Sequence, residues 1–464
     1  METSPFQQIF NQQKAYFISQ ATKSYLQRVE VLKKLRAQIL KYEARIITAM
    51  QADMAKPETE AAGGEIWYVL EEINHTLGHL KRWMKPQKKR TPLLHFRASS
   101  AIYPEPFGQI LIMAPWNYPF NLLFSPLVGA LAAGNTAILK PSELAPRTAE
   151  VIEEMVNDHF DPGLIQVVNG GVETAQMLLS FPFDYIFFTG SPRIGKLVMK
   201  AAAVHLTPVT LELGGKSPAI VDASADLDVA ASRIVWGKFF NAGQTCIAPD
   251  YVLVEKNIHA DLLLRLKGKI HAYYSENPQN SPDLARIINQ DHFKRLVGLL
   301  DADKVVHGGQ TDAVTLYIAP TILDPVTMDD AIMGEEIFGP ILPVITYENL
   351  EEALGTIQMN PNPLALYLFT RDPSVEKRVI AEVPFGGGCI NDTFSHVFNE
   401  EIPFGGRGMS GMGSYHGKYS FETFSHFKSV VHRKNWPDIA MRYPPYKIKN
   451  KTMRKLFKIA SWLV

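Results

Sequence analysis

The stretch GQILIMAPWNYPFNLLFSPLVGALAAGNTAILK, residues 108–140, decides the fold class. Its apolar part, Ile110 to Leu139, is the most hydrophobic region of the chain, but prolines and asparagines interrupt it too often for a membrane span. The pattern instead indicates a strand, a loop, a helix and a second strand. The interrupting residues are Pro115, Asn117, Pro119, Asn121, Pro126 and Asn135.

The same alternation continues beyond this stretch. Short apolar runs are separated by helical or polar segments, and their starts lie roughly 15 to 25 residues apart, which is typical of βαβ units in a doubly wound parallel sheet. A second α/β region with its own candidate strands follows. The runs of the first series are GQILIMA, TAILK, LIQVV, YIFFT, VTLEL and PAIVD, and those of the second are YVLVE, ILPVIT, LYLFT and GGCIND.

The N-terminal part is predicted to be helical. Residues 24–54 carry apolar side chains every three or four positions, and Ser24 with Gln27 forms a capping-box pattern at their start. A second helix is predicted over 65–84. The basic, proline-flanked segment KPQKKRTP, residues 85–92, is interpreted as a solvated loop.

Composition excludes several classes of protein. A chain of 464 residues is too long for one compact core, so two or three domains are expected. Lys plus Arg and Asp plus Glu both number 47, and this balance gives no reason to expect nucleic-acid binding. Two cysteines without a CxxC pair predict neither a disulfide framework nor a metal site, and they suit a reducing, cytoplasmic compartment. The N-terminus lacks the pattern of a signal peptide.

Unusual residues gather at the predicted strand ends of the first half. Asn117 follows ILIMA, Lys140 ends TAILK, Thr189 to Ser191 follow YIFF, and Glu212 ends VTLE. Open α/β sheets bind ligands at the carboxyl ends of their strands. This clustering predicts a cofactor or substrate cleft there.

The segment from Gly190 to Lys196, GSPRIGK, matches the spacing of a phosphate-binding P-loop. The next residue is Leu197, where magnesium binding requires Ser or Thr, so nucleotide hydrolysis is not favoured. A glycine turn that enters a helix still presents N–H groups to a phosphate. The alternative is an ordinary strand-to-helix turn. No GxGxxG fingerprint supports a standard dinucleotide site.

Three acidic residues have both a functional and a structural interpretation. Glu143 with Lys140 can clamp a diol or phosphate, or it can belong to a solvated helix start that Ser142 caps. Glu212 lies between apolar residues and glycines, which suits a desolvated general base as well as a paired structural carboxylate. Glu336 in EEIFGP leaves the same two alternatives open.

The two cysteines differ in their neighbours. Cys246, in FNAGQTCIAPD, follows a run of small and polar residues that is odd for an apolar core position. Taken alone, a free cysteine is more often a buried, inert thiol than a nucleophile. Cys389, in FGGGCIND, has no acid–base partner nearby in sequence and is interpreted as structural.

Seven motifs resemble, in order and spacing, those of the NAD(P)-dependent aldehyde dehydrogenase superfamily. They cover nearly the whole chain, and the tail segment 411–429 is similar to the class 3 branch, which acts on fatty and aromatic aldehydes. The motifs are PWNYPFNL (115–122), LKPSEL (139–144), FTGSPRIGK (188–196), LELGGKSP (211–218), FNAGQTC (240–246), EEIFGP (335–340) and PFGG (403–406).

The resemblance implies a role for each site residue. Cys246 is expected to be the nucleophile, Glu212 the base that activates water, and Asn117 with the Cys246 backbone N–H the oxyanion hole. The small residues before Cys246 are interpreted as clearance for substrate and cofactor. The cofactor, NAD with NADP tolerated, is expected to contact Trp116, Lys140, Glu143, Gly190, Ser191, Gly195, Leu213, Glu336 and Phe338.

The resemblance also implies an architecture. It is an α/β fold with two doubly wound parallel-sheet domains, one Rossmann-like for the cofactor and one catalytic, plus a small β arm for assembly as a homodimer. The expected segments are 1–85 and 105–211 for the cofactor domain, 212–396 for the catalytic domain, 86–104 and 397–440 for the bridging and oligomerisation parts, and 441–464 for a basic tail.

Three alternatives remain. An acylating dehydrogenase would release the thioester to coenzyme A, although a base at position 212 favours hydrolysis. A non-catalytic scaffold on the same fold would not need Cys246, Asn117 and Glu212 together. The tail carries six basic residues beside an apolar side, so it either docks on its own subunit or lies on an anionic membrane. Its basic residues are Lys447, Lys449, Lys451, Arg454, Lys455 and Lys458, and its apolar ones are Leu456, Ile459, Trp462 and Leu463.

Overall fold

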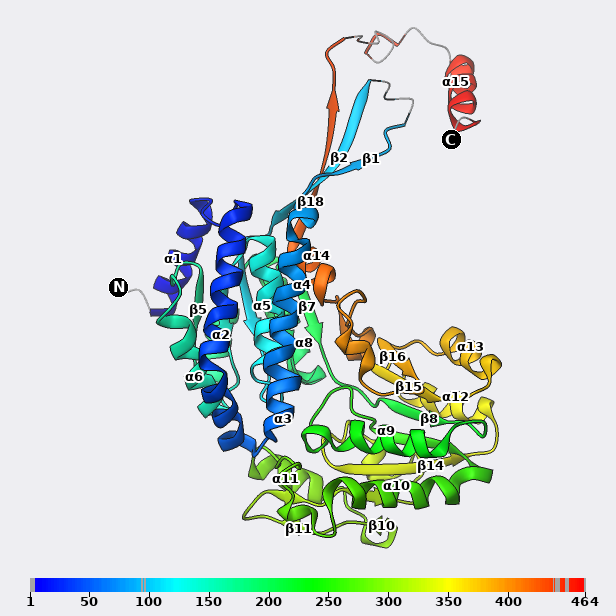
Figure 1. The fold of residues 1–464 in the computed structure, drawn as a ribbon. Coiled ribbons are helices and arrows are strands. Elements are labelled where there is room, and N and C mark those ends of the chain that lie inside the picture. The colour runs from blue at the N-terminus through cyan, green and yellow to red at the C-terminus, as the bar shows by residue number, and fades with distance from the viewer. Residues whose placement is uncertain are drawn as a thin grey trace.

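The computed structural model describes residues 5–92, 95, 97–436, 438, 443–446 and 450–462. It consists of two α/β units, each built on its own sheet, and a β arm that extends away from both (Figure 1).

The first sheet has six strands in the order β17-β7-β6-β3-β4-β5. All of its neighbouring strands are parallel except for β17, which pairs antiparallel with β7 at the edge. These strands are β3 (Gln109–Met113), β4 (Thr136–Lys140), β5 (Ile165–Val167), β6 (Tyr185–Thr189), β7 (Val209–Glu212) and β17 (Gly411–Met412).

Both faces of this sheet are buried, and residues that alternate along β3 show why. Ile110 and Ile112 belong to the main core, whereas Leu111 and Met113 belong to a second core on the other face. Because both faces of the strand are buried, every position from Ile110 to Met113 is apolar, which explains the continuous apolar run in the sequence. The helices of this unit are α1 (Pro5–Ile18), α2 (Tyr25–Met54), α3 (Glu58–Ala61), α4 (Tyr68–Trp83), α5 (Asn121–Ala133), α6 (Pro146–Asn157), α7 (Val172–Leu179) and α8 (Pro192–His205).

The second sheet has seven strands in the order β10-β13-β14-β9-β8-β15-β16, all parallel except for β10. The run PAIVD, assigned above to the first series, forms β8 of this sheet, because the chain crosses between the units after Glu212. The elements are β8 (Pro218–Val221), β9 (Tyr251–Glu255), β10 (Val305–His307), β13 (Thr321–Leu323), β14 (Ile341–Tyr347), β15 (Ala365–Phe369), β16 (Gly387–Ile390), α9 (Leu227–Phe239), α10 (His259–Tyr274), α11 (Gln290–Val297), α12 (Leu350–Met359) and α13 (Pro373–Glu382), with a small pair β11 (Thr311–Asp312) and β12 (Tyr317–Ile318).

The arm is a three-stranded antiparallel sheet of β1 (Gln87–Lys89), β2 (Ala98–Pro106) and β18 (Ser425–Arg433), and α14 (Gly417–Thr423) precedes β18. The interpretation of 85–92 as a loop was therefore wrong for β1, whose residues pair with Ser100 to Ile102. Lysines on an edge strand protect it from further pairing, so a basic segment without apolar alternation can still be a strand.

Two predictions about helix boundaries also need correction. Residues 65–84 begin with a π-helical turn, η1 (Ala62–Trp67), and only then continue as α4. Ser142 does not cap α6, because its Oγ accepts from the nearby Leu144 N–H. Asp53, from the end of α2, instead accepts from the backbone N–H groups of Arg147 and Thr148 at the start of α6. The capping of α2 by Ser24 is confirmed.

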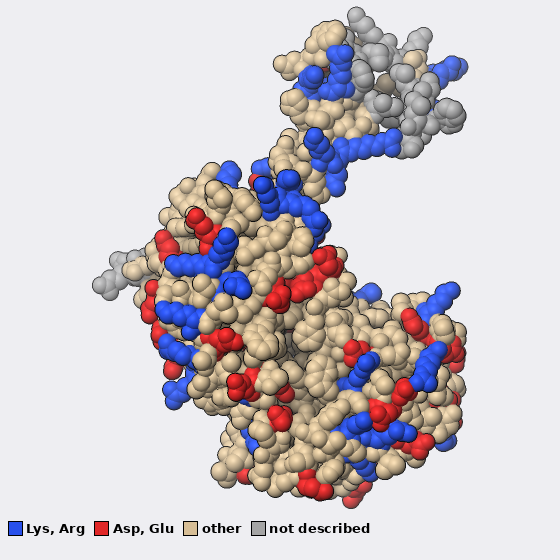
Figure 2. Space-filling model, viewed as in Figure 1, with Lys and Arg blue, Asp and Glu red and all other residues tan. Residues whose placement is uncertain are grey.

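The C-terminal segment contains a helix, α15 (Asn450–Trp462), which is drawn to one side of the far end of the arm in Figure 1. Its described basic side chains are exposed, and Figure 2 shows Lys and Arg along the arm. Of the tail residues named above, Lys447, Lys449 and Leu463 lie outside the described residues. Among the described residues, no helix has the length and apolar character needed to cross a bilayer.

Candidate active site

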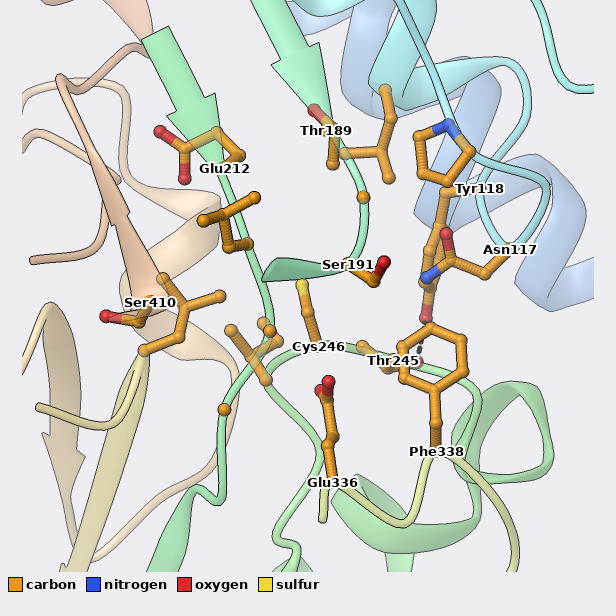
Figure 3. A pocket seen from close by; sticks show the side chains of 18 of the residues that line it. Asn117, Tyr118, Thr189, Ser191, Glu212, Thr245, Cys246, Glu336, Phe338 and Ser410 are labelled. Carbon is orange, nitrogen blue, oxygen red and sulfur yellow. Dashed lines mark hydrogen bonds between the residues drawn. The ribbon is translucent and has the colours of Figure 1, made fainter. Parts of the chain in front are cut away.

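A cavity of about 830 Å³ lies at the carboxyl ends of β3, β6 and β7. The segments that follow these strands line it, together with loops of the second unit (Figure 3). The carboxyl ends of parallel strands are where open α/β sheets bind ligands. Of the site residues predicted from sequence, those in the lining are Trp116, Asn117, Gly190, Ser191, Glu212, Leu213, Cys246, Glu336 and Phe338.

The Cys246 side chain points into this cavity between Glu212 and Glu336 (Figure 3). Glu212 is 3% exposed, and neither of its carboxylate oxygens has a hydrogen-bond partner among the described residues. One oxygen of Glu336 is likewise unpartnered, while a backbone N–H from Gly215 reaches its carboxylate. Buried polar groups normally have partners, so these atoms are available to a bound molecule.

Burial shifts the pKa values of Glu212, Glu336 and Cys246. Desolvation raises the pKa of Glu212 well above its usual range, and it raises the pKa of Glu336 to about 8. Burial, followed by the charges of Glu336 and Glu212, raises the pKa of the Cys246 thiol. A carboxylate whose pKa is raised is a stronger base once it is ionised, which suits Glu212 to proton abstraction.

Asn117 faces the same space as Cys246 (Figure 3). Its side-chain Nδ2 donates to the backbone oxygen of Gln244 at 2.9 Å, which fixes the plane of the amide. An amide nitrogen carries two hydrogens, so a second donor is left for another acceptor. The amide is thus a held donor beside the sulfur.

Small residues are required before Cys246 for a different reason from the one predicted. Asn241, Ala242 and Gly243 have φ angles of 52°, 52° and 73°, so the chain makes a left-handed turn there. A Cβ at Gly243 would lie 2.3 Å from the Gly339 oxygen. The three residues are buried and do not line the cavity, so the clearance interpretation was wrong for them. Bulky or β-branched residues are excluded here by backbone conformation.

Aromatic side chains line another part of the cavity. Phe240 and Phe394 have ring centroids 5.9 Å apart, and Tyr68 and Phe398 are 6.1 Å apart. These rings offer an apolar wall with few polar groups to an incoming molecule. Further apolar residues of the lining are Leu122, Val397, Phe404, Met409 and Tyr415.

Three residues assigned to the cofactor do not line the cavity. Lys140 and Glu143 pair with each other, with 2.8 Å between Nζ and Oε2, and Gly195 packs against the Leu213 side chain. The Gly190 N–H is also not free for a phosphate, because it donates to the Glu212 backbone oxygen at 3.0 Å. Helix α8 nevertheless begins at the cavity, and Arg193 of its first turn belongs to the lining.

The segment 56–65, between α2 and α4, carries no pattern in the sequence that marks it as functional. Lys56 and Glu65 form an ion pair in which both side chains are fully buried. Lys56 Nζ also donates to the Asn117 backbone oxygen at 2.9 Å. A short charged segment between two helices usually indicates a solvated connection, so only the tertiary contacts reveal this pair.

Comparison with known proteins extends these observations. Residues 4–430 match the model of the aldehyde dehydrogenase family. The chain belongs to the aldehyde dehydrogenase family. It is 50% identical to the 4,4'-diaponeurosporen-aldehyde dehydrogenase of Staphylococcus aureus, over 97% of this chain and 99% of that protein. It is 46% identical to aldehyde dehydrogenase family 3 member A2 of Rattus norvegicus, over 94% and 90%.

Solved structures agree with the fold. The substrate-bound state of Staphylococcus aureus AldH matches with a TM-score of 0.96 and 49% identity, covering 98% of this chain and 100% of that one. The NAD-dependent aldehyde dehydrogenase of Sinorhizobium meliloti matches with a TM-score of 0.86 and 28% identity, covering 94% and 88%. The protein is therefore an enzyme of the class 3 branch that oxidises aldehydes, and the predicted α/β fold is confirmed.

Part of the cavity has groups that suit the ribose and the nicotinamide amide of a dinucleotide. Thr189 Oγ1 and Glu336 Oε1 are buried without partners in the described part of the chain, and both residues belong to the lining. Hydroxyl and carboxylate oxygens of this kind accept hydrogen bonds from a ribose or an amide. Trp116 and Phe338 pack edge to face at 5.4 Å and provide an aromatic surface.

Proposed function

We propose that the enzyme oxidises apolar aldehydes to carboxylic acids through a covalent intermediate on Cys246. The observation that carries this proposal is the position of the Cys246 thiol, which faces a cavity beside the unpartnered carboxylate of Glu212 and the held amide of Asn117. A nucleophile, a base and a hydrogen-bond donor around one space are the parts that acyl chemistry needs.

In the first stage the Cys246 thiol, whose pKa burial raises, releases its proton to water, and the thiolate adds to the aldehyde carbon and forms a thiohemiacetal. Asn117 Nδ2 and the Cys246 backbone N–H donate to the oxygen that becomes negatively charged. Removing one donor of this kind typically costs about 10²- to 10³-fold in rate. When bound, the nicotinamide ring supplies a hydride acceptor. Loss of hydride from the thiohemiacetal carbon leaves a thioester on Cys246.

In the second stage Glu212 removes a proton from a water molecule, which attacks the thioester carbon. The carbon–sulfur bond breaks, the carboxylic acid is released and the Cys246 thiol is restored. The raised pKa of Glu212, caused by its burial, supports this role because the carboxylate is then a stronger base. This step also separates hydrolysis from release to coenzyme A.

For the substrate we propose medium- or long-chain aliphatic or aromatic aldehydes. The aromatic wall formed by Tyr68, Phe240, Phe394 and Phe398 supports this class, because burying the apolar surface of a substrate against these rings is favourable. The similar Staphylococcus aureus enzyme, named for a diaponeurosporen aldehyde, supports it as well. A panel from acetaldehyde to long-chain and aromatic aldehydes tests the class, and kcat/KM is expected to rise with apolar surface.

For the cofactor we propose NAD, with NADP tolerated. Glu143 is expected to repel a 2′-phosphate, and its partner Lys140 is expected to reduce that repulsion. Comparing kcat/KM for the two cofactors tests this assignment. A strong preference for NADP would contradict it.

We further propose that the enzyme is a cytoplasmic homodimer whose β arm contributes to assembly. The exposed arm residues Tyr103, Val430 and Val431 support this role, because apolar side chains on a projecting sheet suit a partner surface. Light scattering after size exclusion is expected to give twice the chain mass of 51.9 kDa.

For the tail we propose peripheral contact with an anionic membrane. The exposed basic side chains Lys451, Arg454, Lys455 and Lys458 on α15 support it. Co-sedimentation with anionic liposomes tests the full chain against a truncation before Lys447. Equal soluble fractions would contradict membrane contact and favour a tail that docks on its own subunit.

The covalent step is tested by trapping. Glu212→Gln is mixed with an aldehyde and NAD, quenched, and examined by peptide mass spectrometry. An acyl adduct on the peptide that contains Cys246 is expected, and Cys246→Ala should show neither adduct nor NADH. An adduct that accumulates only when coenzyme A is withheld from the wild type would instead favour the acylating alternative.

A further inference from the structure

The segment between α2 and α4 buries three charged side chains, Lys56, Glu60 and Glu65, next to the active-site cavity. Lys and Glu are almost never fully buried unless they are paired, because removing a charge from water is costly. Glu65 lies in η1, and π-helical turns are frequently found at functional sites.

Lys56 and Glu65 form hydrogen bonds with both ends of the loop 117–121. Lys56 Nζ donates to Glu65 Oε1 and, at 2.9 Å, to the backbone oxygen of Asn117. Glu65 Oε2 accepts from the backbone N–H groups of Phe120 at 2.9 Å and Asn121 at 3.1 Å. The ammonium of Lys56 also lies 4.1 Å from the ring centroid of Tyr118. The loop 117–121 is therefore fixed by one ion pair.

A second set of contacts ties this loop to the turn before Cys246. The Asn241 side chain donates to the same Asn117 backbone oxygen at 3.0 Å and to the Gln244 oxygen at 3.2 Å. Glu60 Oε2 accepts from the Asn241 N–H at 2.8 Å. The buried segment thus contacts both the loop that carries Asn117 and the left-handed turn that leads to Cys246.

We propose that Lys56 and Glu65 are positioning residues for the oxyanion hole. They act through the backbone of the loop 117–121 and set the direction of the Asn117 amide toward the substrate oxygen beside Cys246. The inference rests on the proposed role of Asn117. A displacement of about 1 Å in such a donor can cost about 10²-fold in rate. An ion pair that keeps the donor in place therefore contributes to catalysis without touching the substrate.

A double-mutant cycle with Asn117 tests the inference. Lys56→Met keeps the length of the side chain and removes both of its hydrogen bonds, so kcat for aldehyde oxidation should fall about tenfold to a hundredfold. NAD affinity, measured by fluorescence titration, should change by less than about twofold. In an Asn117→Ala background, Lys56→Met should cost less than about twofold, because residues that act as one unit are not additive.

A matched control separates positioning from the loss of any buried cation. Arg28, near the start of α2, is also buried and donates to the backbone oxygens of Thr22 and Ala132. It lies about 40 Å from Lys56 along the helix axis, at 1.5 Å per residue. Arg28→Met should lower the melting temperature and leave kcat within about twofold. If Lys56→Met does not fold, Glu65→Gln, which has nearly the same shape, takes its place in the cycle.

The outcomes are distinct. If Asn117→Ala loses activity while Lys56→Met keeps it, or if the two losses multiply, the positioning role is overturned and the proposed function stands. If Asn117→Ala keeps full activity, there is no oxyanion amide to position, and both ideas are overturned. Loss of kcat in Lys56→Met that disappears in the Asn117→Ala background supports the positioning role.

Discussion

Cys246 and Cys389 both follow a run of small residues, yet their surroundings differ. Cys246 leaves a left-handed turn and lines the cavity beside carboxylates without partners. Cys389 lies within β16, pairs with Tyr367 of β15, and its sulfur is 3.3 Å from His396 Nδ1. Access to a cavity that also holds a candidate general base distinguishes a nucleophile from a structural cysteine, whereas neighbouring glycines do not.

The prediction that Cys389 has no acid–base partner nearby in sequence was wrong, because His396 lies only seven residues further along the chain and contacts its sulfur. A cysteine with a histidine at hydrogen-bond distance has the form of a catalytic pair. Burial, however, lowers the pKa of His396 to about 4 and raises the pKa of the Cys389 thiol, so both groups are neutral at pH 7. Neither residue lines the cavity. The structural interpretation of Cys389 therefore stays a prediction, now with a named partner.

The largest expected effect separates the two cysteines directly. Cys246→Ala should abolish NAD-linked oxidation of aldehydes, with a loss of at least about 10⁴-fold, because the covalent route is gone. Cys389→Ala should keep activity within about threefold. Steady-state NADH formation measures both variants. Substantial turnover in Cys246→Ala, or equal losses in the two, would sink the assignment.

The next effect concerns the acid beside Cys246. Glu212→Gln should still form the thioester, giving a burst of NADH, but steady-state turnover should fall about 10²- to 10³-fold because general-base catalysis is lost. Since burial raises the pKa of Glu212, the carboxylate forms only as pH rises, so the wild-type deacylation rate should increase with pH. Stopped-flow fluorescence against pH measures this dependence. A burst followed by unchanged turnover in the variant, where hydrolysis limits the rate, would contradict the base role.

A third effect belongs to the partner of Cys389. The pKa of His396 is lowered from 6.5 to about 4 by burial, so the unfolded chain binds more protons below pH 6.5 and stability falls as pH decreases toward 4. Between pH 7 and pH 5 this costs roughly 2 kcal/mol, from 1.36 kcal/mol per pKa unit. His396→Gln should remove that part of the loss. Urea unfolding at pH 5, 6 and 7 measures it, and parallel pH profiles for both proteins would refute the explanation.

The sequence predicted the fold and most of the cavity because those features are local. Apolar runs and strand ends identified β3, β4, β6 and β7, and the motifs brought Asn117, Glu212 and Cys246 together. The domain boundaries and the roles of Lys140, Glu143 and Gly195 stay predictions.

The features that sequence reasoning missed depend on contacts between distant residues. Asn241 and Glu60 are 181 residues apart, and Glu65 and Phe120 are 55 apart. The neighbours of a lysine in sequence do not show whether its side chain is buried or solvated. A buried lysine needs an acidic partner to offset the cost of leaving water, and the fold brings that partner to it. The left-handed turn was missed for the same reason. Small residues fit both clearance and positive φ.

The smallest expected effect tests that turn against the sheet around Cys389. Ala242 in the turn and Ala365 in β15 are both buried, so replacing either with glycine removes one methyl contact and adds similar freedom to the unfolded chain. Only Ala242 has a positive φ, of 52°, which costs an L-residue about 1–2 kcal/mol and costs glycine nothing. Ala242→Gly should therefore be nearly neutral, whereas Ala365→Gly should lose about 1–2 kcal/mol more. Urea unfolding of the two variants gives the difference. Equal losses would mean that the turn before Cys246 carries no strain, and that its small residues are required for some other reason.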